Sequence, residues 1–307
     1  MPEAPDLEII KDYLNANLKD ATVESCKVLR STVVRSLAGE ITSDLPGRTY
    51  LDAQRRGKFL TLRFSGGRSL VINPMLTGAL QHCQGSVRFQ KKTCVTMGVG
   101  GDMDLRYLDD RQMGKVYWID NGEDGGDAQD DLVPQYTGLG PDVLSGISFE
   151  EFQARLKKFN GEIKGVLTRG SFISGIGNAY SDEILHAAHL SPLKLTRTLK
   201  EAESLRLFEA ARTTLELWTD RLRQEVGSGF PEKVTAFRDG MAVHGRYGKP
   251  CEMVDERGST QEAKRIAHTA GHRGNYREES VDGIAAVLIL EGWFAHQEGL
   301  PGGRSAY

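Results

Sequence analysis

Cysteine is scarce in this chain of 307 residues, which contains only Cys26, Cys83, Cys94 and Cys251. No two of them form a C-x-x-C pair, so the sequence encodes neither a disulfide framework nor a zinc site built from two such pairs. Free and widely separated cysteines are typical of a protein from a reducing compartment.

An excess of positive charge is also missing. The chain has 39 Lys and Arg residues against 42 Asp and Glu residues, a formal net charge of −3 and a pI near 6.2. Attraction of the whole molecule to phosphate is therefore excluded, and any nucleic-acid site would have to be a local basic cleft.

Long apolar runs are absent as well. The longest, Gly283 to Leu290, is far too short to span a bilayer. Residues 1–6 carry neither the cationic flank nor the apolar core of a signal peptide. The sequence therefore predicts a cytoplasmic protein.

The length is sufficient for about two domains, each with its own core. Leu7, Ile10, Leu14 and Leu18 recur at helical spacing and predict a helix near the N-terminus. Short strand-like runs follow, at residues 59–64, 69–72, 105–107 and 116–119. Up to about residue 120 the pattern predicts one helix in front of a β-sandwich or barrel-like domain.

A Gly-rich acidic segment, residues 120–131, comes next and is interpreted as a solvated linker. It fits a calcium loop poorly, because a glycine occupies the third ligand position. Helical patterns follow, and two capping boxes, Ser148 with Glu151 and Thr198 with Glu201, predict helix starts. The C-terminal part is rich in Gly and His and has little periodicity.

The N-terminus offers a candidate nucleophile. Removal of Met1 would leave Pro2 with a free secondary amine, whose pKa lies far below that of lysine. Such an amine can form an iminium with a carbonyl-like carbon, and the neighbouring Glu3 can serve as acid or base. The plain alternative is that proline and acidic residues simply start a helix well.

Two further segments are chemically suggestive. Lys58 alternates in step with Leu60, Leu62 and Phe64, so its side chain is predicted to point toward the apolar side of the strand. A lysine there needs a cleft or a charged partner. The alternative is a lysine at the end of a strand whose ammonium group reaches the surface. The segment Gly175 to Tyr180 exposes backbone N–H groups ahead of a helix and can hold a phosphate, although a lone Gly-rich turn is a weak signal.

Six motifs in one order resemble a known family, the formamidopyrimidine-DNA glycosylase / endonuclease VIII family. They are Met1-Pro-Glu-x-Pro-Asp-Leu-Glu8, Arg55-Arg-Gly-Lys58, Leu76-Thr-Gly78, Leu105-Arg-Tyr-x-Asp-x-Arg111, Leu139-Gly-Pro-Asp142 and Gly175-x-Gly-Asn-x-Tyr180. The resemblance extends to about Cys251, and six ordered motifs are far more specific than any one of them.

The resemblance implies an enzyme that excises oxidised bases from duplex DNA and cleaves the strand at the abasic site by β/δ-elimination. Pro2 matches the nucleophile that forms a Schiff base with the sugar, Glu3 the residue that assists proton transfer, and Lys58 a lysine that contacts DNA near the lesion. The target base must be flipped out of the stack.

The resemblance also implies which residues bind DNA. Leu76, Arg111 and Met113 match the three residues that fill the hole left by the flipped base, with Arg111 facing the orphaned partner. Lys164 and Asn178 match phosphate-binding positions. We expect the cations of the DNA-binding surface to converge on one interdomain cleft, namely Arg55, Arg56, Lys58, Arg106, Arg111, Lys164 and Arg169.

The C-terminal part departs from the family pattern, which ends in a four-cysteine zinc finger. Cys251 is present, but Val254, Arg277 and Ser280 occupy the other ligand positions. We therefore expect a zincless finger-like β-hairpin and no cofactor. A weaker alternative is a zinc site from Cys251, His268 and His272, perhaps with His244. Arg273 is the hairpin arginine expected to reach DNA.

The predicted fold is α+β: an N-terminal helix and antiparallel β-sandwich over residues 1–120, a linker over 121–140, a helix–two-turn–helix domain over 141–236 and the degenerate hairpin over 237–307. The predicted partner is duplex DNA with oxidised bases or abasic sites, bound by a monomer near the nucleoid if the source is bacterial. Two rival hypotheses remain: a catalytically inactive damage-binding paralogue, and a general nucleic-acid-binding module.

Overall fold

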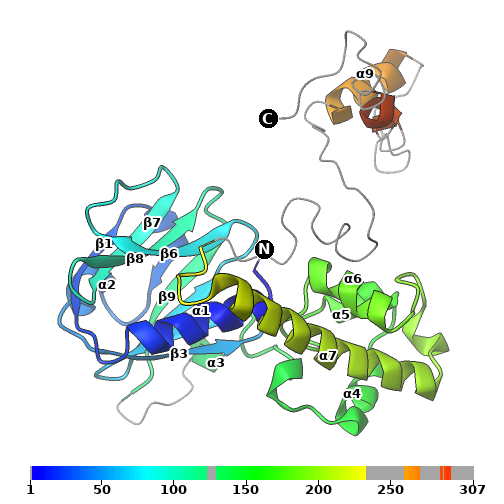
Figure 1. Ribbon diagram of the computed structural model, residues 1–307, viewed down its shortest axis with the longest axis horizontal. Helices are drawn as coiled ribbons and strands as arrows, with labels where there is room; N and C mark the ends of the chain where they lie inside the picture. The colour runs from blue at the N-terminus through cyan, green and yellow to red at the C-terminus, as the bar shows by residue number, and fades with distance from the viewer. Residues whose placement is uncertain (1, 123–128, 233–258, 270–283, 286, 292–307) are drawn as a thin grey trace. The chain divides into compact units, whose positions relative to one another are not determined.

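The computed structural model describes residues 2–122, 129–232, 259–269, 284–285 and 287–291 (Figure 1). The chain divides into two compact units, residues 1–236 and 237–307. The first unit contains a β-sandwich and a helical part.

Two sheets form the sandwich, and they confirm the expected fold class. One has the strand order β1 (Val23–Val28), β7 (Thr93–Val99), β8 (Met103–Asp109), β6 (Gly78–Gln84). The other has the order β2 (Val34–Ser36), β9 (Lys115–Asp120), β5 (Arg68–Asn73), β4 (Phe59–Phe64), β3 (Tyr50–Arg56). All of these pairs are antiparallel except β2 with β9, which is parallel. The four strands read from the sequence correspond to β4, β5, β8 and β9.

The core lies between the sheets and extends under the first helix. Alternate residues of β4, Leu60, Leu62 and Phe64, are all buried, as expected for a strand that covers a core. The apolar face of helix α1 (Ala4–Asn17) belongs to the same cluster, with Leu14 fully buried. The periodicity of the first helix is therefore confirmed, and packing against the sheet holds the N-terminus in place.

The helical part contains α3 (Gln129–Leu132), α4 (Phe149–Leu156), α5 (Ile163–Leu167), α6 (Asn178–Ala187) and the long helix α7 (Glu201–Val226). Ser148 caps α4 as predicted, because its hydroxyl accepts from the N–H of Glu151 at 3.2 Å. The predicted start at Thr198 is wrong: Thr198 ends a 3-10 turn, and Lys200 caps α7 together with Glu203. Helix α7 packs along α1 and α6 (Figure 1).

The second unit is helical where it is described. Helix α9 (Ser259–Thr269) presents Ala263 and Ala267, one turn apart, to Ala285 of a short helical segment. The family resemblance predicts a β-hairpin in this region, but residues 259–269 form a helix instead, with small residues at helical spacing. The rest of the hairpin prediction falls on residues outside the described ones. Within the described chain, no helix is long and apolar enough to cross a bilayer.

Candidate active site

The carboxylate of Glu3 is the centre of the site. Its side chain is 2% exposed and accepts backbone N–H groups at the start of α6, from Gly177 at 2.5 Å, Ala179 at 3.1 Å and Tyr180 at 3.4 Å. A helix N-terminus favours an anion at this position. The Gly-rich turn that the sequence suggested for a phosphate therefore binds a carboxylate of the same chain. A Cβ at Gly177 would lie 2.4 Å from the Glu3 carboxyl, so only glycine fits.

Lys58 lies in the turn between β3 and β4, against the same carboxylate. The Cβ that Gly177 lacks would be 2.7 Å from Lys58 Nζ, which places the lysine beside Glu3. Burial lowers the pKa of Lys58, and the negative charge of Glu3 opposes this change. Burial raises the pKa of Glu3, while Lys58 and the backbone N–H groups oppose it. Pro2 is half-buried and precedes Glu3 directly, so the structure brings the three candidate catalytic residues together.

Asp6 is a second buried acid at the site, and sequence reasoning missed it. It is 1% exposed, accepts the backbone N–H of Glu3 at 2.7 Å and the hydroxyl of Tyr180 at 3.2 Å. Burial, with help from the nearby Glu3 charge, raises the pKa of Asp6 to about 7. The signal for it is the spacing of Glu3 and Asp6, which form a capping box at the start of α1.

An ion-pair cluster holds the Lys58 turn against the helical part. Arg55 is almost fully buried and bonds to Glu8 at 2.5 Å, to both oxygens of Asp142, and to the carbonyl of Gly57 at 2.9 Å. The same Asp142 accepts the N–H of Gly57 at 3.0 Å and that of Leu144 at 3.0 Å. Asp142 therefore joins the β-hairpin to the beginning of the helical part.

Two of the cations expected in a DNA-binding cleft have other roles. Arg55 is used in the internal cluster described above. Arg106 is fully buried and pairs with Asp104 at 2.8 Å beneath the ring of Phe89. The expectation fails for these two because sequence order gives no measure of burial. Arg111 and Arg169 are exposed, and Arg56 stacks on the ring of Tyr136.

The residues expected to fill the hole left by a flipped base lie on two loops at the end of the sandwich. Leu76 is 51% exposed on the loop between β5 and β6. Arg111 and Met113 are exposed on the loop between β8 and β9. Large apolar side chains left in solvent are suited to insertion between bases.

The residues expected to bind phosphate lie on the helical part. Lys164 is on α5 and donates to Asp182 of α6 at 2.9 Å, and Asn178 is the exposed first residue of α6. Arg273 lies outside the described residues.

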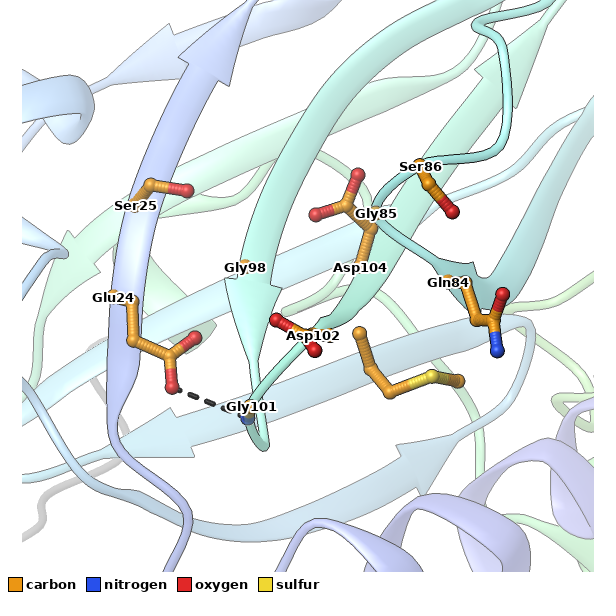
Figure 2. A pocket seen from close by; sticks show the side chains of 10 residues that line it. Glu24, Ser25, Gln84, Gly85, Ser86, Gly98, Gly101, Asp102 and Asp104 are labelled. Carbon is orange, nitrogen blue, oxygen red and sulfur yellow. Dashed lines mark hydrogen bonds between the residues drawn. The ribbon is translucent and has the colours of Figure 1, made fainter.

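Two hollows differ in chemistry. A cavity of about 440 Å³ beside Lys58 is lined mainly by apolar and neutral groups, among them Phe59, Met75 and Leu139. A second hollow of about 500 Å³ lies on the sheet formed by β1, β7, β8 and β6 (Figure 2). Glu24, Asp102 and Asp104 line it, and this acidic wall would repel phosphate.

The chain does not fit the metal that the resemblance would bring. Val254, Arg277 and Ser280 cannot replace the missing thiolates. Among the described residues, no group of three metal-binding side chains comes together. Of the alternative zinc ligands, His268 lies in α9, and Cys251, His272 and His244 lie outside the described residues.

The fold and the site define a protein of the class that combines a β-sandwich with a helix–two-turn–helix domain. Residues 1–116 match the family model of the formamidopyrimidine-DNA glycosylase N-terminal domain, and residues 139–221 match that of its H2TH domain. A curated formamidopyrimidine-DNA glycosylase of Pelotomaculum thermopropionicum is 30% identical over 264 residues, 84% of this chain and 92% of the relative. The chain belongs to the formamidopyrimidine-DNA glycosylase family.

Other relatives and solved structures are similar to this chain over most of its length. The formamidopyrimidine-DNA glycosylase of Heliobacterium modesticaldum is 32% identical, covering 82% of this chain and 91% of its own. The crystal structure of the MutM (Fpg) protein from Thermus thermophilus is 29% identical with a TM-score of 0.62, over 74% of this chain and 77% of that one. Lactococcus lactis Fpg in complex with abasic-site DNA has the same fold, at 22% identity and a TM-score of 0.67 over 80% and 88%.

The C-terminal region gives a different match. Residues 228–296 match the family model of a Holliday junction resolvase, and most of them lie outside the described residues. Three of the four zinc-finger ligands are missing from this same region.

Proposed function

We propose that this protein is a DNA glycosylase with AP lyase activity that acts in base excision repair. It excises oxidised bases from duplex DNA and then cleaves the strand at the abasic site. The observation that carries the proposal is the position of Glu3, held by the start of α6 and facing Lys58 directly after Pro2.

The first step is attack by the N-terminal amine of Pro2, once Met1 is removed, on C1′ of the damaged nucleotide. The amine lone pair forms the N–C1′ bond, and the electrons of the glycosidic bond leave with the base, which takes up a proton. The carboxyl of Glu3 is raised in pKa and lies next to the amine, so it can donate a proton to the sugar oxygen as the ring opens.

Ring opening leaves an iminium between Pro2 and C1′. The iminium accepts the electrons released when a proton is lost from C2′, and the phosphate on the 3′ side leaves. A second elimination releases the 5′ phosphate. Lys58 supplies positive charge beside the reacting phosphates, and its lowered pKa results from burial in the same site.

Exposed residues of two loops fill the space that the flipped base leaves in the DNA stack. Leu76 and Met113 occupy the vacated space in the stack, and Arg111 hydrogen-bonds the orphaned partner base. Lys164, Asn178 and Arg273 bind phosphates. Chromosomal DNA as substrate supports a cytoplasmic, nucleoid-associated location.

The proposal is tested by borohydride trapping. Tag-free protein is mixed with a duplex that contains one abasic site, reduced, and separated on a denaturing gel. A covalent band that maps to Pro2 is expected, and a protein with an N-terminal extension that blocks Pro2 should give no band. Tight binding without any band would instead support the catalytically inactive paralogue.

A further inference from the structure

The two loops that carry Leu76, Arg111 and Met113 lie side by side for a topological reason. We name them the wedge loops: residues 74–77 between β5 and β6, and residues 110–114 between β8 and β9. Each carries the chain from one sheet of the sandwich to the other. Their flanking strands are paired, with Asn73 opposite Lys115 and Gly78 opposite Asp109. Both crossings therefore occur at the same end of the sandwich.

Each wedge loop contains a residue in the left-handed backbone region. Met75 has φ 48° and Gln112 has φ 53°. This conformation is unfavourable for a residue with a side chain and persists only where the surroundings impose it. Something in the fold must therefore hold both loops in these conformations.

The group that contacts both loops is the carboxylate of Asp109, which is 1% exposed. One oxygen accepts the hydroxyl of Thr77, from the first loop. The other accepts the N–H of Gly114, from the second loop, at 2.7 Å, and the hydroxyl of Tyr107 at 3.3 Å. A buried carboxylate requires such donors, and these three satisfy it.

The packing around this carboxylate leaves no spare room. A Cβ at Gly78 would lie 2.4 Å from the hydroxyl oxygen of Tyr107, and one at Gly114 would lie 1.9 Å from it. Gly78 directly follows the first wedge loop, and Gly114 ends the second. Because these two positions have no side chain, both loops can approach Asp109 this closely.

We propose that Asp109 is a positioning residue that fixes the two wedge loops to each other, so that Leu76, Arg111 and Met113 enter the DNA stack as one rigid unit. The inference rests on the proposed function. Asp109 itself does not touch DNA. Its effect is on the step that fills the hole left by the flipped base. Its side-chain hydrogen bonds go to Thr77, Tyr107 and Gly114, and none of these is a candidate catalytic residue.

The test compares Thr77→Val and Asp109→Asn with wild type and with a matched control, Thr93→Val. Thr93 lies on β7, and its buried hydroxyl has no hydrogen-bond partner among the described residues, so its loss breaks no bond seen there. Two substrates are used: a duplex with one oxidised base, which requires hole filling, and a single-stranded oligonucleotide with one abasic site, which does not. Rates come from strand cleavage and from borohydride trapping respectively.

Thr77→Val is expected to slow cleavage of the damaged duplex about tenfold, as expected for loss of a hydrogen bond to a charged group, and Asp109→Asn by at least as much. Trapping on the single strand should change less than about twofold, and Thr93→Val should resemble wild type on both substrates. The inference is overturned if Thr77→Val leaves duplex cleavage unchanged, or if it slows both substrates equally. Failure of the wild-type protein to trap either substrate would overturn the proposed function itself.

Discussion

The ionisation of Asp6 is coupled to folding. Its raised pKa, about 7, means that the folded protein binds a proton more tightly than the unfolded chain, where the carboxyl has a pKa near 3.8. Stability that depends on this proton is fully present below about pH 4 and is lost as the pH rises through 7. The acid lies next to Glu3, so the same proton is available near the catalytic site at neutral pH.

The replacement Asp6→Asn removes this titration. Between pH 5 and 8 we expect the wild-type melting temperature to fall relative to the variant, with a change in unfolding free energy of up to roughly 3 kcal/mol. Thermal unfolding at several pH values measures it. Asp20→Asn is the matched control, because Asp20 is exposed and has a left-handed backbone that asparagine also adopts. Parallel pH curves for all three proteins would contradict the assignment.

Arg111 is expected to read the base opposite the lesion. Arg111→Ala should reduce the preference among opposite bases about tenfold, because a guanidinium that hydrogen-bonds a base edge contributes roughly 1–3 kcal/mol of discrimination. Excision rates on duplexes that differ only in the opposite base provide the measurement. Lys115→Ala, a loss of the same charge at the start of β9, should weaken binding without altering the preference. An unchanged preference in Arg111→Ala would remove the reading role.

At the scale of elements, the hairpin of β3 and β4 depends on a contact made by the helical part. Asp142 holds both Arg55 and the N–H of Gly57, one residue before Lys58. The position of Lys58 is therefore set by a residue that follows it by more than eighty positions in the sequence.

Asp142→Ala should destabilise the protein by about 3–5 kcal/mol, because it leaves the buried charge of Arg55 without one of its partners. The control is Asp52→Ala, which breaks a more exposed pair with Arg63 on the same two strands and should cost less than about 1 kcal/mol. Denaturant unfolding compares the two. Equal losses would mean that the Arg55 cluster has no special role.

Elements with a local sequence pattern could be predicted, whereas contacts between distant segments could not. The periodicity of Leu7, Ile10 and Leu14 is local, so helix α1 could be predicted, and alternation predicted β4 in the same way. Burial of Arg106 and the pairing of Arg55 with Asp142 depend on contacts between distant segments, which composition and spacing do not reveal. The roles of Asp6 and Asp109 were missed for the same reason, although both lie within the quoted motifs.

At the scale of the whole molecule, the second unit differs most from the expected pattern. Its described residues are helical, and its sequence has lost three of the four cysteine ligands. The first unit alone contains Pro2, Glu3, Lys58 and the wedge loops. Catalysis should therefore not depend on a metal.

Treatment with a chelator should leave excision and borohydride trapping unchanged within about twofold, because the thiolates of a structural zinc site are missing. Metal content measured by mass spectrometry on the purified full-length protein provides the check. Stoichiometric zinc whose removal abolishes activity would instead support Cys251, His268 and His272 as ligands.

The position of Glu3 has a consequence for the charge of the molecule. Glu3 is the N-cap of α1 and also accepts from the first turn of α6, so two helix dipoles direct their positive ends at one point. Together they amount to roughly one positive charge, supplied by peptide groups that have no pKa in the working range. They offset the negative charge of the Glu3 carboxylate, so this buried acid repels a phosphodiester less than its formal charge suggests. This part of the field is invisible to a count of lysines and arginines, and it persists at any pH at which the two helices are folded.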